Sequence, residues 1–131
     1  MSRTIEQRRA AFALSFINYQ LSNNTSKKED KEKLSTHIHK SPSLILQCGL
    51  GQALAFLLAD AADKPTPSKL LYDTLQDWLC GAPDKAYPMR VYSQAKLMDM
   101  LVNGTRDEYF RAQEESLMLL NWLKKFAAAK L

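Results

Sequence analysis

The sequence predicts an all-α protein, a compact bundle of about six helices in a single domain spanning residues 1–131. Apolar residues recur at spacings of three, four and seven, and no run alternates with the period of two expected of a strand. Only four glycines occur, and the five prolines lie at predicted segment boundaries. A length of 131 residues suits one domain, and a hydrophobic fraction of 46% is enough for one core.

The first helix is expected to begin at Thr4. Thr4 and Gln7 have the spacing of a capping box, in which a hydroxyl and a later side-chain amide satisfy free backbone N–H groups. Residues 22–26 are Ser, Asn and Thr, which favour local turns and should end the helix. One apolar stripe is expected along the helix, and it consists of Ile5, Phe12, Phe16 and Tyr19.

The charged run at 27–33 predicts an exposed loop that leads into a short second helix ending near Lys40. Ser41 then has the chemistry of an N-cap, and Pro42 suits the first position of a new helix. The third helix should therefore run from Pro42 to about Ala62.

This third helix is apolar on most of its sides, which is typical of a helix in the middle of a bundle. Gly49 and Gly51 lower its helix propensity by about 1 kcal/mol each relative to alanine. We expect close approach by a neighbouring helix to compensate for this loss. Cys48 and Cys80 lie on apolar stretches and are interpreted as buried free thiols.

Three more helices complete the predicted bundle. Thr66 and the proline after it repeat the cap-and-proline signal for the fourth helix, and Gly81 suits the position just after its end. The fifth helix is expected over residues 89–102. Thr105 begins the sixth through a second capping box with Glu108. The sixth helix is apolar on several sides, which indicates burial by more than one neighbour or by a partner protein.

The sequence offers little catalytic or metal-binding chemistry. His37 and His39 are two residues apart on a predicted helix, so their rings diverge and do not share one metal. Cys48 and Cys80 lie far apart and form no Cys-x-x-Cys motif. We therefore expect no catalytic residues, no metal, no cofactor and no small-molecule substrate. A metal-free ribonuclease that uses His37 or His39 is the enzymatic alternative.

No stretch is long and apolar enough to predict a transmembrane helix. The longest apolar region, residues 44–62, is interrupted by Gln47, Gln52 and Asp60. The first four residues lack the apolar core of a signal peptide. These features predict a cytoplasmic protein with no membrane partner.

The net charge of +4 is concentrated in the first part of the chain. Residues 1–41 hold eight Lys or Arg and four Asp or Glu, whereas the remainder holds ten of each sign. This basic stretch either attracts an anionic polymer or forms a solvated surface. Arg9 lies at the edge of the apolar stripe, where it either pairs with an acid on another helix or contacts a phosphate or a partner.

Three blocks of residues occur in order along nearly the whole chain, with little contribution from residues 64–104. The blocks are Thr4-x-Glu6-Gln7-x-Arg9-Ala10; Pro42-x-x-Ile45 followed by Gly49-Leu50-x-Gln52-Ala53-x-Ala55-Phe56-Leu57; and Tyr109 with Glu115 and Leu117, followed by Trp122-Leu123-Lys124-Lys125-Phe126-Ala127. In combination they resemble the small α-helical subunit of type III-B CRISPR (Cmr) effector complexes.

The resemblance implies a non-catalytic subunit in antiviral defence. Copies of such a subunit stack into a short filament beside the backbone subunits and the large subunit, and they help hold target RNA paired with guide RNA. The alternative is a purely structural spacer without RNA contact, favoured by the wide apolar cover of the sixth helix. A contact that serves any guide must meet phosphates, which Lys and Arg bind. The candidates are Arg9, which matches the first block, with Arg8, Lys27, Lys28, Lys31 and Lys33, and also Lys124 and Lys125 of the third block.

Overall fold

The computed structural model of the protein describes residues 3–22, 28–81 and 90–131, and these ranges contain six α-helices and no strand. The all-α prediction is therefore confirmed. Within the same ranges, no helix combines the length and the apolar character needed to cross a bilayer. The helices are α1 (Ile5–Ser22), α2 (Lys28–Cys48), α3 (Leu50–Ala61), α4 (Pro67–Cys80), α5 (Leu97–Asn103) and α6 (Arg106–Lys130).

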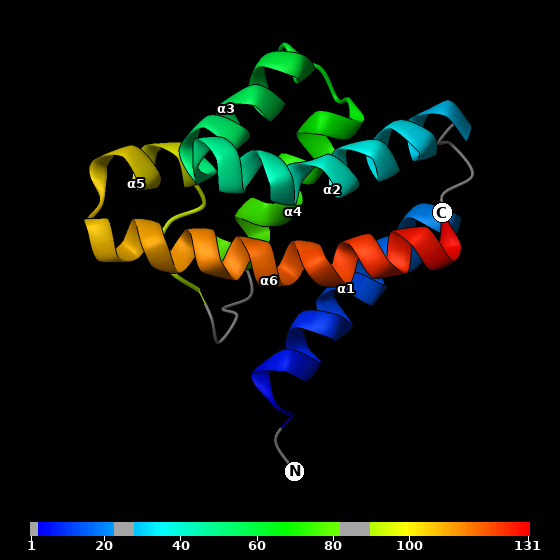
Figure 1. Cartoon of the computed structure of the whole chain (residues 1–131), viewed down its shortest axis with the longest axis horizontal. Coiled ribbons are helices and arrows are strands. Elements are labelled where there is room, and N and C mark those ends of the chain that lie inside the picture. The colour runs from blue at the N-terminus through cyan, green and yellow to red at the C-terminus, as the bar shows by residue number, and fades with distance from the viewer. Residues whose placement is uncertain (1–2, 23–27, 82–89) are drawn as a thin grey trace.

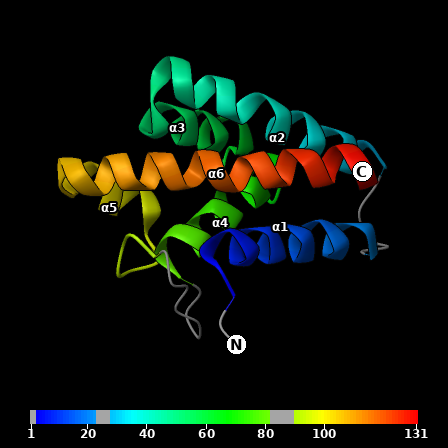
Figure 2. The same ribbon diagram turned by 60° about the horizontal axis from the view of Figure 1, so that its bottom comes forward.

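The longest helix, α6, runs the length of the molecule, with α2 along one side of it and α1 along the other (Figures 1 and 2). Helix α4 lies behind α6 in Figure 1 and contacts α2, α3, α5 and α6. Buried apolar side chains from all six helices form one core. Helices α3, α4 and α6 each contact several other helices of the bundle.

Three predicted helix starts are confirmed by their hydrogen bonds. The Thr4 N–H donates to Gln7 Oε1 at 2.8 Å, and the Gln7 N–H donates to the Thr4 hydroxyl at 3.1 Å. Thr105 and Glu108 form the same reciprocal pair at the start of α6, with distances of 2.9 and 3.1 Å. The Thr66 hydroxyl accepts a backbone N–H from the first turn of α4 at 3.4 Å. Each start was predicted from residues that interact within one turn.

The second helix differs from its prediction, because α2 continues from Lys28 to Cys48 through Pro42. The loop expected at 27–33 and the helix start expected at Pro42 are therefore wrong for the described residues. Ser41 does not cap a helix; its hydroxyl donates to the carbonyl of His37 at 2.6 Å. Burial explains why the proline is tolerated, since one buried face continues in phase on both sides of it. That face consists of Leu34, Ile38, Ser41 and Ile45.

The break between α2 and α3 falls at Gly49, whose φ of +87° is accessible mainly to glycine. A Cβ at this position would lie 3.0 Å from the Tyr109 hydroxyl of α6. That hydroxyl accepts the Gly51 N–H at 2.9 Å, and Gln113 Oε1 accepts the Leu50 N–H at 2.9 Å. Side chains of α6 thus cap the start of α3. The predicted close approach at the two glycines is confirmed.

The fifth helix is shorter than predicted and begins at Leu97. Residues 90–96 are not helical, and the predicted first residue, Met89, lies outside the described residues. The N–H groups of Val91 and Tyr92 both donate to the carbonyl of Leu79, at 2.7 and 3.1 Å. This segment therefore satisfies a carbonyl at the end of α4 in place of forming its own helical turn.

The two free cysteines lie in different surroundings. Cys80 is buried, as predicted, and burial raises the pKa of its thiol to about 11. Cys48, at the end of α2, is exposed, so its predicted burial is wrong. The neighbouring Leu46 is 73% exposed, which shows that the end of α2 is less covered than its apolar sequence indicates.

Candidate functional site

The buried face of α1 is polar at both ends. It consists of Arg9, Ala13, Ile17 and Gln20. The predicted stripe lies to one side of this face, since Phe12 and Phe16 are only partly buried and Tyr19 is 65% exposed. Two polar residues therefore sit where the apolar pattern alone would place core side chains.

At one end, Arg9 forms a buried ion pair with Glu115 of α6. Arg9 Nε and Nη2 donate to the two oxygens of Glu115 at 2.6 and 2.9 Å. The third guanidinium nitrogen, Nη1, donates to Glu6 at 2.8 Å, and Trp78 Nε1 of α4 donates to Glu115 at 2.8 Å. Arg9 is 7% exposed and Glu115 2% exposed. The cluster of Arg9, Glu115 and Trp78 therefore joins α1, α4 and α6 by bonds to charged groups.

The ion-pair alternative for Arg9 is thus found in the structure, and Glu115 is its partner. The hydrogen bond to Glu115 raises the pKa of Arg9 above its ordinary value, against the opposing effect of burial. An RNA contact by Arg9 would first require this pair to open. The partner is 106 residues away in sequence. A signal that could have indicated it is an acid on the mostly apolar buried face of α6.

The two histidines are held by bonds within the fold. His37 Nε2 lies 3.0 Å from the hydroxyl of Ser68, which is buried and donates its proton to Asp60. Because the hydroxyl has one proton, Nε2 must donate to it, which is the reverse of the bond in a hydrolase triad. His39 Nδ1 lies 2.7 Å from the carbonyl of Ser35 and donates to it. Neither ring nitrogen in these bonds is arranged as a base toward a nucleophile.

The structure brings most of the predicted RNA-binding lysines to one end of the molecule. The N-terminal end of α2 lies near the C-terminal end of α6 (Figures 1 and 2). Arg8 is half-buried in the first half of α1, and Lys27 lies outside the described residues. The lysines on the two neighbouring ends are Lys28, Lys31 and Lys33 of α2, and Lys124 and Lys125 of α6.

The lysines of α2 and α6 differ in their surroundings. Those of α2 are interleaved with Glu29, Asp30 and Glu32, so this stretch has no net charge. In contrast, α6 has no acid after Glu115. The acid of another helix that lies nearby is Glu6 of α1, which accepts a hydrogen bond from Trp122 Nε1 at 2.7 Å and also pairs with Arg9. The exposed lysines of this part of α6 are Lys124, Lys125 and Lys130. The last, Lys130, is not among the RNA-binding candidates that were predicted from the sequence.

A shallow groove runs between α2 and α6 beside these lysines. Its volume is about 250 Å³, and Lys124 stands at its edge. Lys125 Nζ lies 5.8 Å from the centre of the Trp122 ring, close enough for a cation–π contact. The groove therefore combines apolar lining with positive charge. Its other lining residues are Pro42, Leu117, Met118 and Asn121.

Comparison with known proteins identifies the family. The family model described as CRISPR-associated protein (Cas_Cmr5) matches residues 5–130. The chain belongs to this family. The fold is similar to the X-ray crystal structure of a CRISPR-associated Cmr5 family protein from Thermus thermophilus, with 25% sequence identity and a TM-score of 0.72. That match covers 98% of this chain and 99% of the other. The protein is thus a small subunit of the type III-B CRISPR (Cmr) kind.

In this Cmr5-family chain, the three sequence blocks that carried the resemblance contact one another. Arg9 of the first block pairs with Glu115 of the third. Gly49 of the second block lies against Tyr109 of the third, since a Cβ at Gly49 would be 3.0 Å from the Tyr109 hydroxyl. The motif residues thus hold helices together, and their pattern reflects packing between α1, α3 and α6 more than a surface.

The described part of this Cmr5-family chain contains no group of three His, Cys, Asp or Glu side chains that could hold a metal ion. Its polar clusters are the Arg9 cluster and the bonds that join His37, Ser68 and Asp60. Both link helices within the fold. The exposed lysines and the exposed apolar side chains take no part in these two clusters, so they stay available for a partner.

Proposed function

We propose that the protein is a non-catalytic subunit of a Cmr effector complex that acts in antiviral defence in the cytoplasm. In this proposal, copies of the chain stack into a filament beside the backbone subunits and the large subunit. The filament helps hold target RNA paired with guide RNA in a basic groove. Membership of the Cmr5 family over residues 5–130 supports the place in the complex.

The observation that carries the RNA contact is the end of α6, where three exposed lysines follow Glu115 and no further acid occurs in the helix. Such a surface binds phosphates and does not distinguish bases, as required when the guide RNA supplies the sequence choice. We place Lys124, Lys125 and Lys130 first among the contacts. The lysines of α2, at positions 28, 31 and 33, follow because neighbouring acids offset their charge, and Arg8 follows because it is half-buried and less accessible.

Two other predicted contacts have less structural support. Arg9 is held by Glu115 and Glu6, so it contributes to the proposed groove only through the packing of α1. Lys27 stays a candidate from its charge alone.

A role without catalysis is supported by the histidine bonds, since His37 donates to Ser68 and His39 donates to Ser35. Incubation of the purified chain with labelled RNA should give no cleavage products, and cleavage that is lost on substitution of His37 or His39 would restore the ribonuclease alternative.

The decisive experiment removes the three charges of α6 by Lys124→Gln, Lys125→Gln and Lys130→Gln. Binding of target RNA by the assembled complex should weaken. The slope of log K against log salt should fall by about 0.7–0.9 for each phosphate that the variant no longer neutralises. A matched control removes three exposed basic charges outside the helices, at Lys64, Arg90 and Lys96. Equal affinities and equal slopes for both triple variants would contradict the RNA contact.

A purely structural spacer is the second candidate, and exposed apolar side chains favour it. Leu46, Val102 and Phe110 are all exposed, and they belong to the α2 end, α5 and the α6 start. These three segments lie at the end of the molecule opposite the lysines (Figure 1). If the protein is only a spacer, the three lysine substitutions should be silent. Substitution of the three apolar residues by serine should then prevent assembly of the complex.

A further inference from the structure

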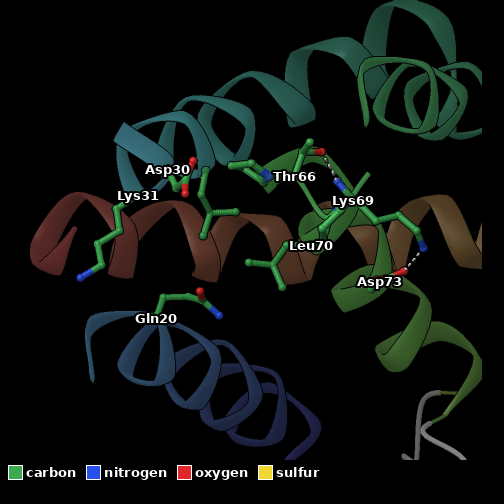
Figure 3. Close-up of a pocket in the computed structure, with 10 residues that line it drawn as sticks. Gln20, Asp30, Lys31, Thr66, Lys69, Leu70 and Asp73 are labelled. Carbon is green, nitrogen blue, oxygen red and sulfur yellow. Dashed lines mark hydrogen bonds and ion pairs between the residues drawn. The ribbon is translucent and has the colours of Figure 1, made fainter. Parts of the chain in front are cut away.

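A cavity of about 220 Å³ opens between the end of α1, the start of α2 and the start of α4 (Figure 3). Its walls are mostly apolar, and charged side chains stand at the mouth. The volume is far larger than a single water requires and smaller than the range typical of drug-sized ligands. It suits one large side chain. The apolar lining residues are Leu34, Pro65, Pro67 and Leu70.

Gln20 is the polar group inside this cavity. It is 5% exposed, and Figure 3 shows its side chain leaving α1 with the amide end toward Leu70. Among the described residues, no hydrogen bond to the Gln20 amide is found. Because the amide lines the cavity, water or a group bound there can supply its hydrogen bonds. The amide offers a carbonyl acceptor and two N–H donors, so it can bond to either kind of polar tip.

We propose that this cavity binds one aromatic side chain with a polar tip, Tyr or Trp, presented by a polypeptide segment of another subunit of the complex. The ring lies between the two leucines and the two prolines, and its hydroxyl or indole N–H bonds to Gln20. Rings with one polar end suit a pocket that is apolar at its walls and polar at one point. Such side chains also dominate the binding energy of interfaces when they fill pockets.

The charges at the mouth favour a polypeptide over an unpaired RNA base. Lys69 is neutralised by Asp73 at a distance of 2.5 Å, which leaves Asp30 and Lys31 as neighbours of opposite charge. The described residues contain no ion-pair partner for either of these two. With two carboxylates and two ammonium groups the mouth has no net charge, so it offers the phosphate of a nucleotide no net attraction. A peptide can meet Asp30 and Lys31 with one residue of each sign.

A second copy of this chain fits the cavity less well. Among the described residues, Tyr19 is the exposed aromatic side chain with a polar tip, whereas the exposed Phe56 and Phe110 have none. Tyr19 precedes Gln20 in α1, beside the cavity. Two copies could use it only by facing each other through the ends of their α1 helices. A different subunit faces no such restriction.

The first test uses the isotope-labelled full chain and four small probes in NMR titrations. N-acetyl-tyrosinamide and N-acetyl-tryptophanamide should shift the side-chain amide of Gln20 and the methyl groups of Leu34 and Leu70. N-acetyl-leucinamide, which has no polar tip, should bind about fivefold more weakly, as expected for the loss of one hydrogen bond. No shifts with the aromatic probes, or tighter binding of adenosine monophosphate at the same resonances, would overturn the proposal.

Two variants separate binding from folding. Leu70→Trp fills the cavity from its own wall and should abolish the shifts caused by both aromatic probes, while the rest of the spectrum is retained. Gln20→Leu keeps the apolar walls and should weaken both aromatic probes about fivefold. If both variants bind the probes like the original chain, the cavity is not the site.

The partner is tested in the assembled complex with a photoreactive diazirine lysine in place of Lys31, at the mouth of the cavity. Crosslinks should map to a peptide of another subunit that contains Tyr or Trp. Crosslinks to RNA, to a second copy through Tyr19, or to nothing would overturn this assignment. The inference relies on the proposed place in the complex but not on RNA contact. Loss of RNA binding in the α6 lysine variants and loss of this crosslink are therefore independent results.

Discussion

The two polar ends of the buried face of α1 behave in opposite ways. At Arg9, each guanidinium nitrogen donates to a carboxylate, and a tryptophan from a third helix completes the cluster. At Gln20, the amide faces a cavity and has no hydrogen-bond partner among the described residues. A buried polar group whose bonds are complete stabilises one packing of the helices. One whose bonds are incomplete, beside a cavity, can bond to whatever occupies that cavity.

The largest expected effect on stability is at the Arg9 end of this face, where the hydrogen bonds are complete. Glu115→Leu removes the partner of the buried guanidinium and the acceptor of Trp78, so it should lower the free energy of unfolding by about 3–5 kcal/mol. Urea denaturation followed by circular dichroism measures this loss. The double variant Arg9→Met with Glu115→Leu should recover part of it, since no unpaired charge stays buried, although the Trp78 N–H still lacks its acceptor. A double variant as unstable as the single one would show that the pair is not coupled.

The second prediction concerns the tryptophan of the same cluster. Trp78→Phe keeps most of the ring contact with Phe12, whose centre lies 4.9 Å from that of the indole, but removes the N–H bond to Glu115. The free energy of unfolding should fall by about 1.5–3 kcal/mol, the range for hydrogen bonds to charged groups. In the Glu115→Leu background the same substitution should have a smaller effect, because the acceptor is already gone. Equal effects in both backgrounds would separate Trp78 from the cluster.

Sequence reasoning succeeded where interactions are local. The capping boxes at Thr4 and Thr105 and the cap at Thr66 each lie within one turn, and all three were predicted. It failed at Pro42, where the local preference for a helix start is opposed by a face buried against other helices. The helix break instead falls at Gly49, whose backbone is fixed by contact with α6.

The site could be predicted only in outline. The three blocks indicated the family, but the contacts that explain them join residues as far as 106 positions apart. Arg9 was recognised as unusual, whereas its partner could not be chosen among the acids without the fold. Gln20 gave no signal at all, because a polar residue near a helix end is ordinary until burial is known. The roles of Arg9 and Gln20, at the two ends of the buried face of α1, thus become visible only in the tertiary structure.

The third prediction concerns Gln20, at the other end of the buried face of α1, and here we expect a gain in stability. Gln20→Leu removes an unbonded amide, so the free energy of unfolding should rise by up to about 1 kcal/mol. The matched control is Gln113→Leu, whose amide oxygen accepts the Leu50 N–H at 2.9 Å. That substitution should cost about 1 kcal/mol. Thermal unfolding of both variants measures the difference, and a loss of stability at both positions would indicate that the Gln20 amide is bonded in the folded chain.

The smallest effect comes from Asp77, a carboxylate that has no ion-pair partner among the described residues, in contrast to Glu115. The pKa of Asp77 is raised, mainly by burial and then by the negative charge of Asp73, and no ion pair to it is found in the described residues. A raised folded-state pKa means that the ionised carboxylate destabilises the fold at neutral pH. Asp77→Asn should therefore raise the free energy of unfolding at pH 7 by less than about 1 kcal/mol, because the group is only partly buried.

This gain should depend on pH in a defined direction. It should shrink as pH falls through the folded-state pKa of Asp77 and disappear below the ordinary value of 3.8, where the carboxyl is protonated in both states. Urea denaturation of both chains between neutral and acidic pH measures the difference. A gain that is independent of pH would assign the effect to packing. A loss at pH 7 would show that Asp77, like Glu115, is stabilised by a partner in the folded protein.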